Sequence, residues 1–230
     1  MKHHYKYFLI LIIMSVVTIA LARKPITANR YEQLSGIRST NNPKILWDKK
    51  YGRGDYVYGK TPAKFLVENY HYIKPGGTVL DMGMGEGRNA VFLSQKGYKV
   101  TGVDISSVAV KKARKLAKEQ GTNINGVVAS LTEYKIPAET FDAILAFYYV
   151  DRDLNARISK WLRPGGILVY EAYTEKQKEK EKKGSSDFQY YLKEQELLSM
   201  FPSFKVLKYE EPTNEGNYRA SIVLQKPKKN

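Results

Sequence analysis

The stretch Val79–Gly87, which reads VLDMGMGEG, is the most informative part of the sequence. It runs from a short apolar segment into an acid, Asp81, and then through three glycines to the start of a helical pattern. Glycines let a backbone approach a ligand where a Cβ atom would clash, and the first turn of a helix offers free amide groups. A strand, a glycine-rich loop and a helix in this order hold nucleotide-like ligands at the carboxyl ends of parallel strands. The alternative interpretation is a tight turn that binds nothing.

A dinucleotide site is the first candidate for such a loop, and the spacing argues against it. The fingerprint of that site is G-x-G-x-x-G, whereas Gly87 comes one residue early and Arg88 stands where the third glycine belongs. Asp81 would also lie close to the pyrophosphate, and like charges repel. A cationic ammonium would be attracted there instead. Asp104, 23 residues further on at the end of the next expected strand, can accept both hydroxyls of a ribose. Paired acids around one glycine loop therefore favour a ligand with a cationic amino-acid end and a ribose, namely S-adenosylmethionine.

Apolar segments alternate with helical patterns along the rest of the chain. This alternation predicts βαβ units and a parallel sheet, and the closing pair of strands predicts an antiparallel hairpin at the sheet edge. The expected fold is a three-layer, Rossmann-like α/β fold with a mostly parallel seven-stranded sheet. The expected strands are 78–80, 98–103, 124–129, 141–147, 167–173, 204–209 and 218–225, and the expected helices are 62–70, 87–96, 106–120, 154–162 and about 193–200.

The composition excludes several kinds of site. There is no cysteine, and two of the three histidines, His3 and His4, precede an apolar N-terminal run. A thiolate site, a histidine-rich metal site and a serine–histidine triad are therefore not expected, and neither is a metal. The 38 Lys+Arg outnumber 23 Asp+Glu, a formal charge of +15 that attracts anionic surfaces. Since no arginines alternate with aromatics in a stripe, scattered surface lysines are the simpler interpretation, and no nucleic-acid partner is expected.

The N-terminal residues resemble a targeting segment. A basic start is followed by an uncharged run over 8–22 that ends in Ala20-Leu21-Ala22, which is typical of a secretory signal cleaved near Ala22. As a helix the run would be about 22 Å long, short of the roughly 30 Å hydrocarbon core. More positive charges follow the run than precede it, so an uncleaved anchor would leave the rest of the chain in the cytoplasm. We expect a signal peptide or membrane anchor over 1–22, a linker over 23–43 and a folded domain over 44–230.

The glycine-rich stretch resembles motif I of the class I S-adenosylmethionine-dependent methyltransferases, and Val103-Asp104 resembles their second acidic motif. Residues 44–226 as a whole resemble the small-molecule methyltransferases that include tellurite-resistance and thiopurine-type enzymes. The segments that carry this second resemblance are Trp47-Asp48 with Tyr51, Tyr58-Gly59, Gly85–Ala90, Phe141–Ile144, Leu162–Gly166 and Glu171–Thr174. The resemblance implies the methyltransferase form of the Rossmann-like fold and S-adenosylmethionine as the cofactor.

The resemblance also implies roles for single residues. It assigns the methionine end of the cofactor to Asp81, Gly83 and Gly85 with Gly87 in the same loop, the ribose to Asp104, the adenine face to Ile105, the adenine edge to Ser130 and Leu131, and the transferable methyl group to Phe147. The chain departs from the family pattern at Met84, where a small residue is common. At the end of the third strand it has Ala129-Ser130 in place of an acid, so a backbone carbonyl or the Ser130 hydroxyl would have to read the adenine amine.

Methyl transfer from a sulfonium is an in-line displacement, for which a protein mainly supplies orientation and a dry site. A tyrosine with a pKa near 10 is a poor base at neutral pH, so we expect positioning roles for the tyrosines near the carboxyl edge of the sheet and name no certain catalytic residue. These tyrosines are Tyr51, Tyr58, Tyr148 and Tyr173, for which plain packing is the alternative.

The expected methyl acceptor is a small molecule. Phe147–Val150 reads FYYV, which is not the Asn/Asp-Pro-Pro-aromatic element of amide and adenine N-methyltransferases. A thiol or reduced chalcogen is therefore expected. The alternatives are a lipid headgroup or membrane quinone, a catalytically silent donor-binding module tethered to the membrane, or an exported nucleoside-binding protein. Because S-adenosylmethionine is made in the cytoplasm, an anchored domain that faces the cytoplasm is favoured over an exported one.

Overall fold

The computed structural model describes residues 42–181, 190–212 and 218–228 of the chain. From Pro43 onward these residues belong to one compact unit. The predicted targeting segment over 1–22 and nearly all of the predicted linker lie outside the described residues, so that division of the chain stays a prediction. Within the described part, no helix is long and apolar enough to cross a membrane.

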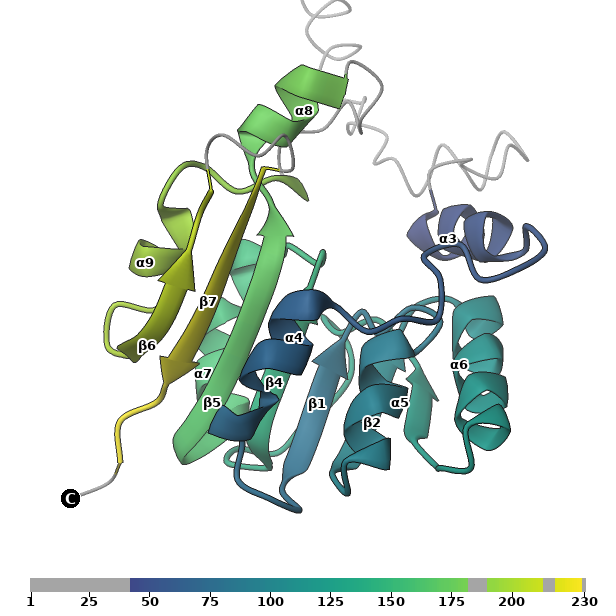
Figure 1. The fold of residues 1–230 in the computed structure, drawn as a ribbon, viewed down its shortest axis with the longest axis horizontal. Helices are drawn as coiled ribbons and strands as arrows, with labels where there is room; N and C mark the ends of the chain where they lie inside the picture. The colour runs from purple at the N-terminus through teal and green to yellow at the C-terminus, as the bar shows by residue number, and fades with distance from the viewer. Residues whose placement is uncertain (1–41, 182–189, 213–217, 229–230) are drawn as a thin grey trace, which may run out of the picture. The chain divides into compact units, whose positions relative to one another are not determined.

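A seven-stranded sheet organises the domain, with the strand order β3-β2-β1-β4-β5-β7-β6 (Figure 1). The strands are β1 (Thr78–Met82), β2 (Lys99–Asp104), β3 (Asn125–Val128), β4 (Phe141–Phe147), β5 (Leu162–Tyr173), β6 (Lys205–Glu210) and β7 (Arg219–Gln225). The first five pair in parallel, whereas β7 pairs antiparallel to both β5 and β6. The predicted sheet with its C-terminal antiparallel hairpin is thereby confirmed. The hairpin forms the edge of the sheet, with β6 outermost and β7 between β5 and β6.

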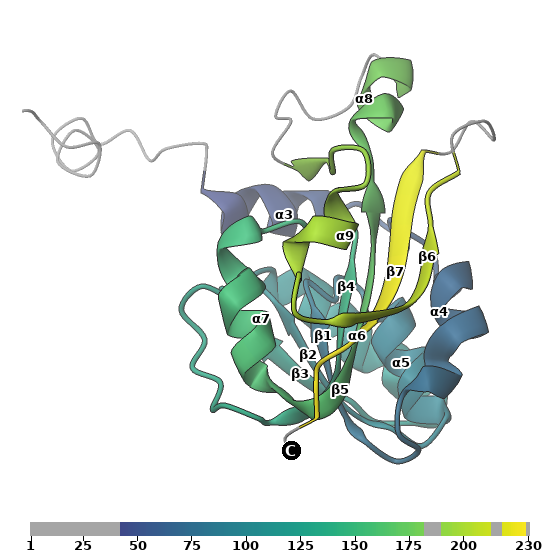
Figure 2. The ribbon, with the colours of Figure 1, turned by 90° about the vertical axis from the view of Figure 1, so that its left-hand side faces the viewer.

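Helices cover both faces of the sheet, as Figure 2 shows. Helices α4, α5 and α6 pack on one face, and α7 and α9 pack on the other. The helices are α3 (Pro43–Tyr51), α4 (Lys64–Asn69), α5 (Arg88–Gln95), α6 (Ser107–Glu119), α7 (Asn155–Trp161), α8 (Glu175–Glu181) and α9 (Glu196–Met200), with the 3-10 turns η1 (Tyr70–Tyr72) and η2 (Arg152–Leu154). This arrangement is the expected three-layer one.

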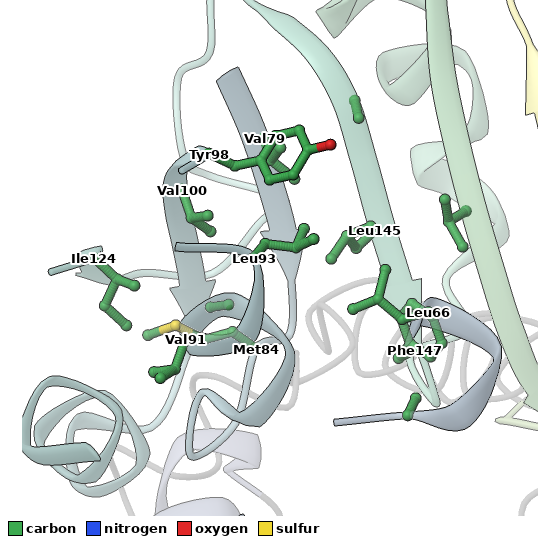
Figure 3. Packing of buried hydrophobic residues seen from close by; sticks show 14 of the residues in the cluster. Leu66, Val79, Met84, Val91, Leu93, Tyr98, Val100, Ile124, Leu145 and Phe147 are labelled. Atoms are coloured by element: carbon green, nitrogen blue, oxygen red, sulfur yellow. The ribbon is translucent and has the colours of Figure 1, made fainter. Parts of the chain in front are cut away.

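The hydrophobic core has two parts, one on each side of the sheet. Strand β4 is apolar at almost every position because both of its faces are covered, as in buried parallel strands generally. Leu145 and Phe147 belong to the cluster under α4 and α5, and Ile144 belongs to the cluster under α7. Figure 3 shows the first cluster, in which Leu66 of α4 lies beside Phe147.

Met84 fits the glycine loop because of two glycines on neighbouring strands. A Cβ atom added to Gly102 of β2 would lie 2.0 Å from the Met84 sulfur, and one added to Gly126 of β3 would lie 3.3 Å from its terminal methyl group. The large side chain thus fills space that these two glycines leave open. The departure from the family pattern at this position is therefore accommodated inside the core.

Expected boundaries are wrong at three further places besides the end of β1, which extends to Met82 rather than residue 80. The helix expected from Pro62 begins at Lys64, since Ala63 is extended and its amide donates to Asn89 Oδ1. The last helix begins at Glu196 rather than near residue 193, because Gln195 adopts a left-handed conformation. The fifth strand begins at Leu162 rather than 167, and a register shift in its pairing with β4 accommodates the Pro-Gly-Gly segment.

Candidate cofactor and acceptor site

The glycine loop connects the carboxyl end of β1 to the first turn of α5. Gly83 and Gly85 have φ values of +60° and +55°, a region in which L side chains are rarely found. Gly87, the N-cap of α5, also has a positive φ, and a Cβ atom there would lie 2.6 Å from the Cβ atom of Ala113 in α6. The loop therefore presents its backbone through Gly83 and Gly85, while Gly87 allows α5 and α6 to pack closely.

Asp81 lies inside β1 rather than after it, and its side chain is only 2% exposed. Burial and the nearby Asp104 raise the pKa of Asp81 from 3.8 to about 7, although Arg88 and the Ala90 amide oppose the rise. Among the described residues, no group donates a hydrogen bond to the Asp81 Oδ2 atom. A buried carboxylate oxygen without a partner is costly, and a cationic group at this place would satisfy it. The ammonium of S-adenosylmethionine fits this requirement.

Asp104 ends β2 one strand away and is bonded to the loop. Its Oδ2 atom accepts a hydrogen bond from the Gly85 amide at 2.9 Å, and its Oδ1 atom accepts one from the Ser106 amide at 2.8 Å. Burial raises the pKa of Asp104, and these two backbone bonds partly offset that rise. Each carboxylate oxygen can accept a further hydrogen bond, so the ribose assignment is compatible with this geometry.

Two tyrosine rings lie against the glycine loop. A Cβ atom at Gly85 would lie 2.8 Å from the Tyr51 hydroxyl, and one at Gly83 would lie 2.5 Å from Cδ2 of Tyr149. Tyr51 is 5% exposed, and its ring stacks on Trp47 at 5.5 Å and meets Tyr58 edge-on at 6.2 Å. Burial strongly raises the pKa of both Tyr51 and Tyr149, so neither hydroxyl is a base at neutral pH. These rings exclude water from the loop.

Helix α3, which carries Tyr51, is attached to the start of α6 through Asp48. Asp48 Oδ1 accepts hydrogen bonds from the Ser106 hydroxyl at 2.6 Å and from the Val108 amide at 3.3 Å. Burial opposes ionisation of Asp48, but its hydrogen bonds with Lys44, Ser106 and Val108 outweigh that effect and lower the pKa to about 2. The ionised carboxylate thus caps α6 from outside.

The other two candidate tyrosines meet at the ends of β4 and β5. The rings of Tyr148 and Tyr173 lie 4.8 Å apart, and the Tyr148 hydroxyl donates a hydrogen bond to Oε1 of Glu171 at 2.7 Å. The Arg88 guanidinium lies 5.7 Å from the centre of the Tyr148 ring and also donates to the Tyr58 carbonyl. Arg88 therefore links the glycine loop to Tyr148. The four tyrosines thus form two groups, Tyr51 with Tyr58 and Tyr148 with Tyr173.

A cavity of about 480 Å³ lies between α4 and the last strands and is lined in part by Glu171, the hydrogen-bond partner of Tyr148. Its lining is Lys64, Phe65, Glu68, Glu171, Glu210, Glu211, Pro212, Arg219 and Ser221. A second cavity, of about 450 Å³, includes Thr78, Lys99 and Asn125 at the amino ends of β1, β2 and β3. The carboxyl ends of the parallel strands are where ligands bind in such sheets, so the first cavity is the candidate acceptor site.

The other residues that were predicted to contact the cofactor differ in how deeply they are buried. Ile105 and Ser130 are half-buried near the ends of β2 and β3. A hydrogen bond from the Ala129 amide to the Asp104 carbonyl joins these two strand ends. Leu131 is 4% exposed and packs in the core under α7. Phe147 is 7% exposed and packs in the opposite core. Their roles toward the cofactor stay predictions.

Sequence reasoning missed two residues of this region. Tyr149 is not among the four candidate tyrosines, yet its ring covers Gly83. Glu171 was noted only as part of a motif, yet it bonds Tyr148 and lines the cavity. The available signal was their position near the ends of adjacent strands. Among the described residues, no group of three potential His, Cys, Asp or Glu metal ligands is present.

Comparison with known proteins agrees with this geometry. Residues 79–166 match the family model described as a methyltransferase domain. The chain is 31% identical over 118 residues to ribosomal protein L11 methyltransferase of Thermus thermophilus, covering 50% of this chain and 45% of that one. It is 30% identical over 166 residues to phosphoethanolamine N-methyltransferase 3 of Arabidopsis thaliana, covering 70% of this chain and 33% of that one. The chain thus spans less than half of the length of these relatives.

Solved structures show the same fold. A S-adenosylmethionine-dependent methyltransferase from Methanosarcina mazei superposes with a TM-score of 0.56 at 22% identity, covering 70% of this chain and 97% of that one. TehB from Haemophilus influenzae superposes with a TM-score of 0.58 at 20% identity, covering 80% of this chain and 66% of that one. The closer resemblance to tellurite-resistance and thiopurine-type enzymes stays a prediction. The match over 79–166 thus identifies a methyltransferase domain within the chain, and the sheet order and the glycine loop are those of the class I S-adenosylmethionine-dependent type, whose cofactor is S-adenosylmethionine.

Proposed function

We propose that the protein transfers a methyl group from S-adenosylmethionine to a small-molecule acceptor such as a thiol or reduced chalcogen. The observation that supports S-adenosylmethionine as the donor is the buried Asp81 oxygen without a partner, beside a loop in which Gly83 and Gly85 have positive φ values. Bound S-adenosylmethionine supplies an activated methyl group. Asp81 would hold its ammonium, and Asp104 would hold its ribose hydroxyls.

The protein's own contribution is orientation and the exclusion of water. The rings of Tyr51 and Tyr149 lie against the glycine loop and would have to turn aside or slide along the ligand as it enters. Arg88, which follows the glycine loop and lies 5.7 Å from the centre of the Tyr148 ring, would lie where the donor side meets the acceptor side. Because Tyr51 and Tyr149 stay protonated, their hydroxyls can donate hydrogen bonds but cannot take a proton at neutral pH.

Two observations support a small acceptor. The cavity beside Glu171 measures about 480 Å³, which lies within the range of about 300–1,000 Å³ of small-molecule sites. The end of β4 and the residues after it read FYYV (147–150) rather than the element of amide and adenine N-methyltransferases. The names of the relatives do not agree on an acceptor, since they include protein, sterol, tRNA and phosphoethanolamine methyltransferases.

A lipid headgroup or a membrane quinone is the second candidate acceptor, favoured by the apolar run over 8–22. In that proposal residues 1–22 anchor the chain, residues 23–43 form a linker, and the catalytic domain faces the cytoplasm, where the donor is made. Mass spectrometry of the mature N-terminus tests it. An intact N-terminus supports the anchor, and cleavage near Ala22 supports export.

Calorimetric titration of the full chain with S-adenosylmethionine, with S-adenosylhomocysteine and with NAD tests the donor. We expect binding of the first two and none of NAD. The Asp104→Ala variant should bind the donor at least about 100-fold more weakly, because two hydrogen bonds to a charged group are lost at about 1.5–3 kcal/mol each. The exposed Asp153→Ala variant is the matched control. An unchanged affinity in Asp104→Ala would refute the ribose assignment, and donor binding without turnover of any thiol would favour a silent donor-binding module.

A further inference from the structure

Glu171 is a buried carboxylate near the carboxyl end of β5, and the donor groups of three residues lie around it. It is 2% exposed. Its Oε1 atom accepts a hydrogen bond from the Tyr148 hydroxyl at 2.7 Å, and its Oε2 atom accepts one from the Ser221 hydroxyl at 2.8 Å. The Arg219 guanidinium lies 3.6 Å from the same Oε2 atom. Two strands, β5 and β7, therefore fix the position of this carboxylate.

Tyr148 is held in an uncommon backbone conformation by the same residue. Its φ of +56° is one of only three positive values at non-glycine residues in the described part of the chain. Such a conformation is strained for a residue with a side chain and persists only where the surroundings determine it. The Tyr148 amide donates to the Glu171 carbonyl at 2.7 Å while its hydroxyl donates to the Glu171 side chain. With 37% of the residue exposed, the ring remains accessible from outside.

This pair lies between the donor loop and the cavity. In the sheet register Met82, the last residue before the glycine loop, is opposite Ala146, and Phe147 is opposite Glu171. Tyr148 thus follows the strand that adjoins the donor loop, and Glu171 lines the cavity on the next strand. The charged and titratable groups that face the pair are Arg88 after β1, Tyr173 on β5, Arg219 on β7, Lys64 and Glu68 on α4, and Glu210 and Glu211 at the end of β6.

We propose that Tyr148 and Glu171 accept the proton that the methyl acceptor loses, an inference that rests on the proposed methyltransferase function. The acceptor atom X, which carries a hydrogen, forms a bond with the methyl carbon. The carbon–sulfur bond breaks and its electron pair stays on sulfur. The X–H proton passes to the Tyr148 oxygen as the Tyr148 proton passes to Oε1 of Glu171. Glu171 then releases this proton to solvent through the cavity that it lines.

A proton-accepting pair at this position favours one class of methyl acceptor. A base is useful only when the acceptor keeps its proton at neutral pH, as alkyl thiols and alcohols do. An acceptor that is already an anion gains little from it. The pair therefore indicates a neutral X–H acceptor, and an alkyl thiol is the member of this class that agrees with the function proposed above.

Two thiols of similar size test the pair. Benzyl thiol keeps its proton at neutral pH, whereas thiophenol is largely a thiolate. In the full chain, we expect Glu171→Gln to lower kcat/KM for benzyl thiol by about 100-fold and to change the value for thiophenol by less than about threefold. Tyr148→Phe should show the same selectivity. The exposed Glu133→Gln variant, which makes the same chemical change away from the cavity, should leave both values unchanged.

The outcomes separate the possibilities. Equal losses for both thiols in Glu171→Gln would show that Glu171 only holds the structure, and no loss for either would also overturn the proposal. If Glu171→Gln fails to fold, Tyr148→Phe decides the matter alone, because it removes one hydroxyl from a partly exposed ring. Calorimetry with S-adenosylhomocysteine should give the same affinity in all variants. Wild-type protein that does not bind S-adenosylhomocysteine would refute the proposed function itself. Wild-type protein that binds it but methylates neither thiol would overturn the acceptor class together with the proton-accepting pair.

Discussion

Replacing Asp81 by Asn should make the ligand-free protein more stable while it weakens donor binding. The reason is that Asp81 is buried, that one of its oxygens has no partner in the described structure, and that its pKa rises from 3.8 to about 7. Between these two pH values the unfolded chain ionises Asp81 whereas the folded protein keeps it protonated. The stability of the wild type therefore falls as the pH rises through this range, and the full cost is present above pH 7.

The magnitude follows from the change in pKa. A difference of one in pKa corresponds to about 1.36 kcal/mol, so the rise from 3.8 to about 7 costs about 4 kcal/mol of folding free energy at pH 8. The Asn amide would leave its own donor without a partner, at about 1–2 kcal/mol, so the net gain for Asp81→Asn is about 2–3 kcal/mol. In a domain of this size that gain raises Tm by roughly 5–10 °C.

Thermal and denaturant unfolding of the full chain at pH 4 and pH 8 measure this effect. We expect Asp81→Asn to exceed the wild type in stability at pH 8 and to lose this advantage at pH 4. Asp55→Asn, on an exposed loop, is the matched control and should show no such dependence. A stability difference that is the same at both pH values would refute the assigned burial cost.

Donor binding should change in the opposite direction. The donor ammonium pairs with an ionised Asp81, so Asp81→Asn should bind S-adenosylmethionine about 10- to 100-fold more weakly, the loss of about 1.5–3 kcal/mol for one charged hydrogen bond. Below pH 7, binding to the wild type should release a proton, which calorimetry in buffers of different ionisation enthalpy detects. Donor binding without proton release at pH 6 would place the ammonium elsewhere.

Two further predictions concern the elements around the loop. Gly87→Ala should destabilise the protein by about 2–3 kcal/mol in denaturant unfolding, since its Cβ atom would lie 2.6 Å from that of Ala113, whereas Gly97→Ala, with a similar φ and nothing within 4 Å, should cost only about 1 kcal/mol. Asp48→Asn should make α3 more sensitive to limited proteolysis at neutral pH. In the wild type, the ionised Asp48 stabilises the fold fully above its unfolded pKa of 3.8, and this contribution is lost as the pH falls through about 2. The variant should lack this contribution. Equal costs at the two glycines, or unchanged cleavage of α3, would contradict these assignments.

The sequence was sufficient for the fold because the deciding signals are local. The glycine loop lies directly between β1 and α5, and the helix expected from Ser106 begins at Ser107, with Ser106 as its cap. The acceptor side depends instead on pairing between distant segments. Glu171 meets Tyr148 across 23 residues and Ser221 across 50, and no sequence pattern shows such contacts.

The boundaries that were wrong have the same origin. The left-handed Gln195 donates its amide to Glu211, which lies 16 residues away, and this contact shortens the last helix. The extended Ala63 donates to Asn89, 26 residues away, and this contact delays α4. Tyr149 could be placed near the end of β4 from the sequence, but its contact with Gly83 depends on how β4 pairs with β1.

The place of β7 in the sheet has a consequence for synthesis on the ribosome. Strand β7 lies between β5 and β6, and Ala220, Ile222 and Val223 are fully buried there. While a nascent chain emerges, β5 has its β4 partner but its other edge stays open until residue 225 has left the exit tunnel. An open edge of this kind is prone to pairing with other chains. A chaperone that binds extended apolar segments would therefore be expected to bind this chain in the interval between the emergence of β5 and that of residue 225.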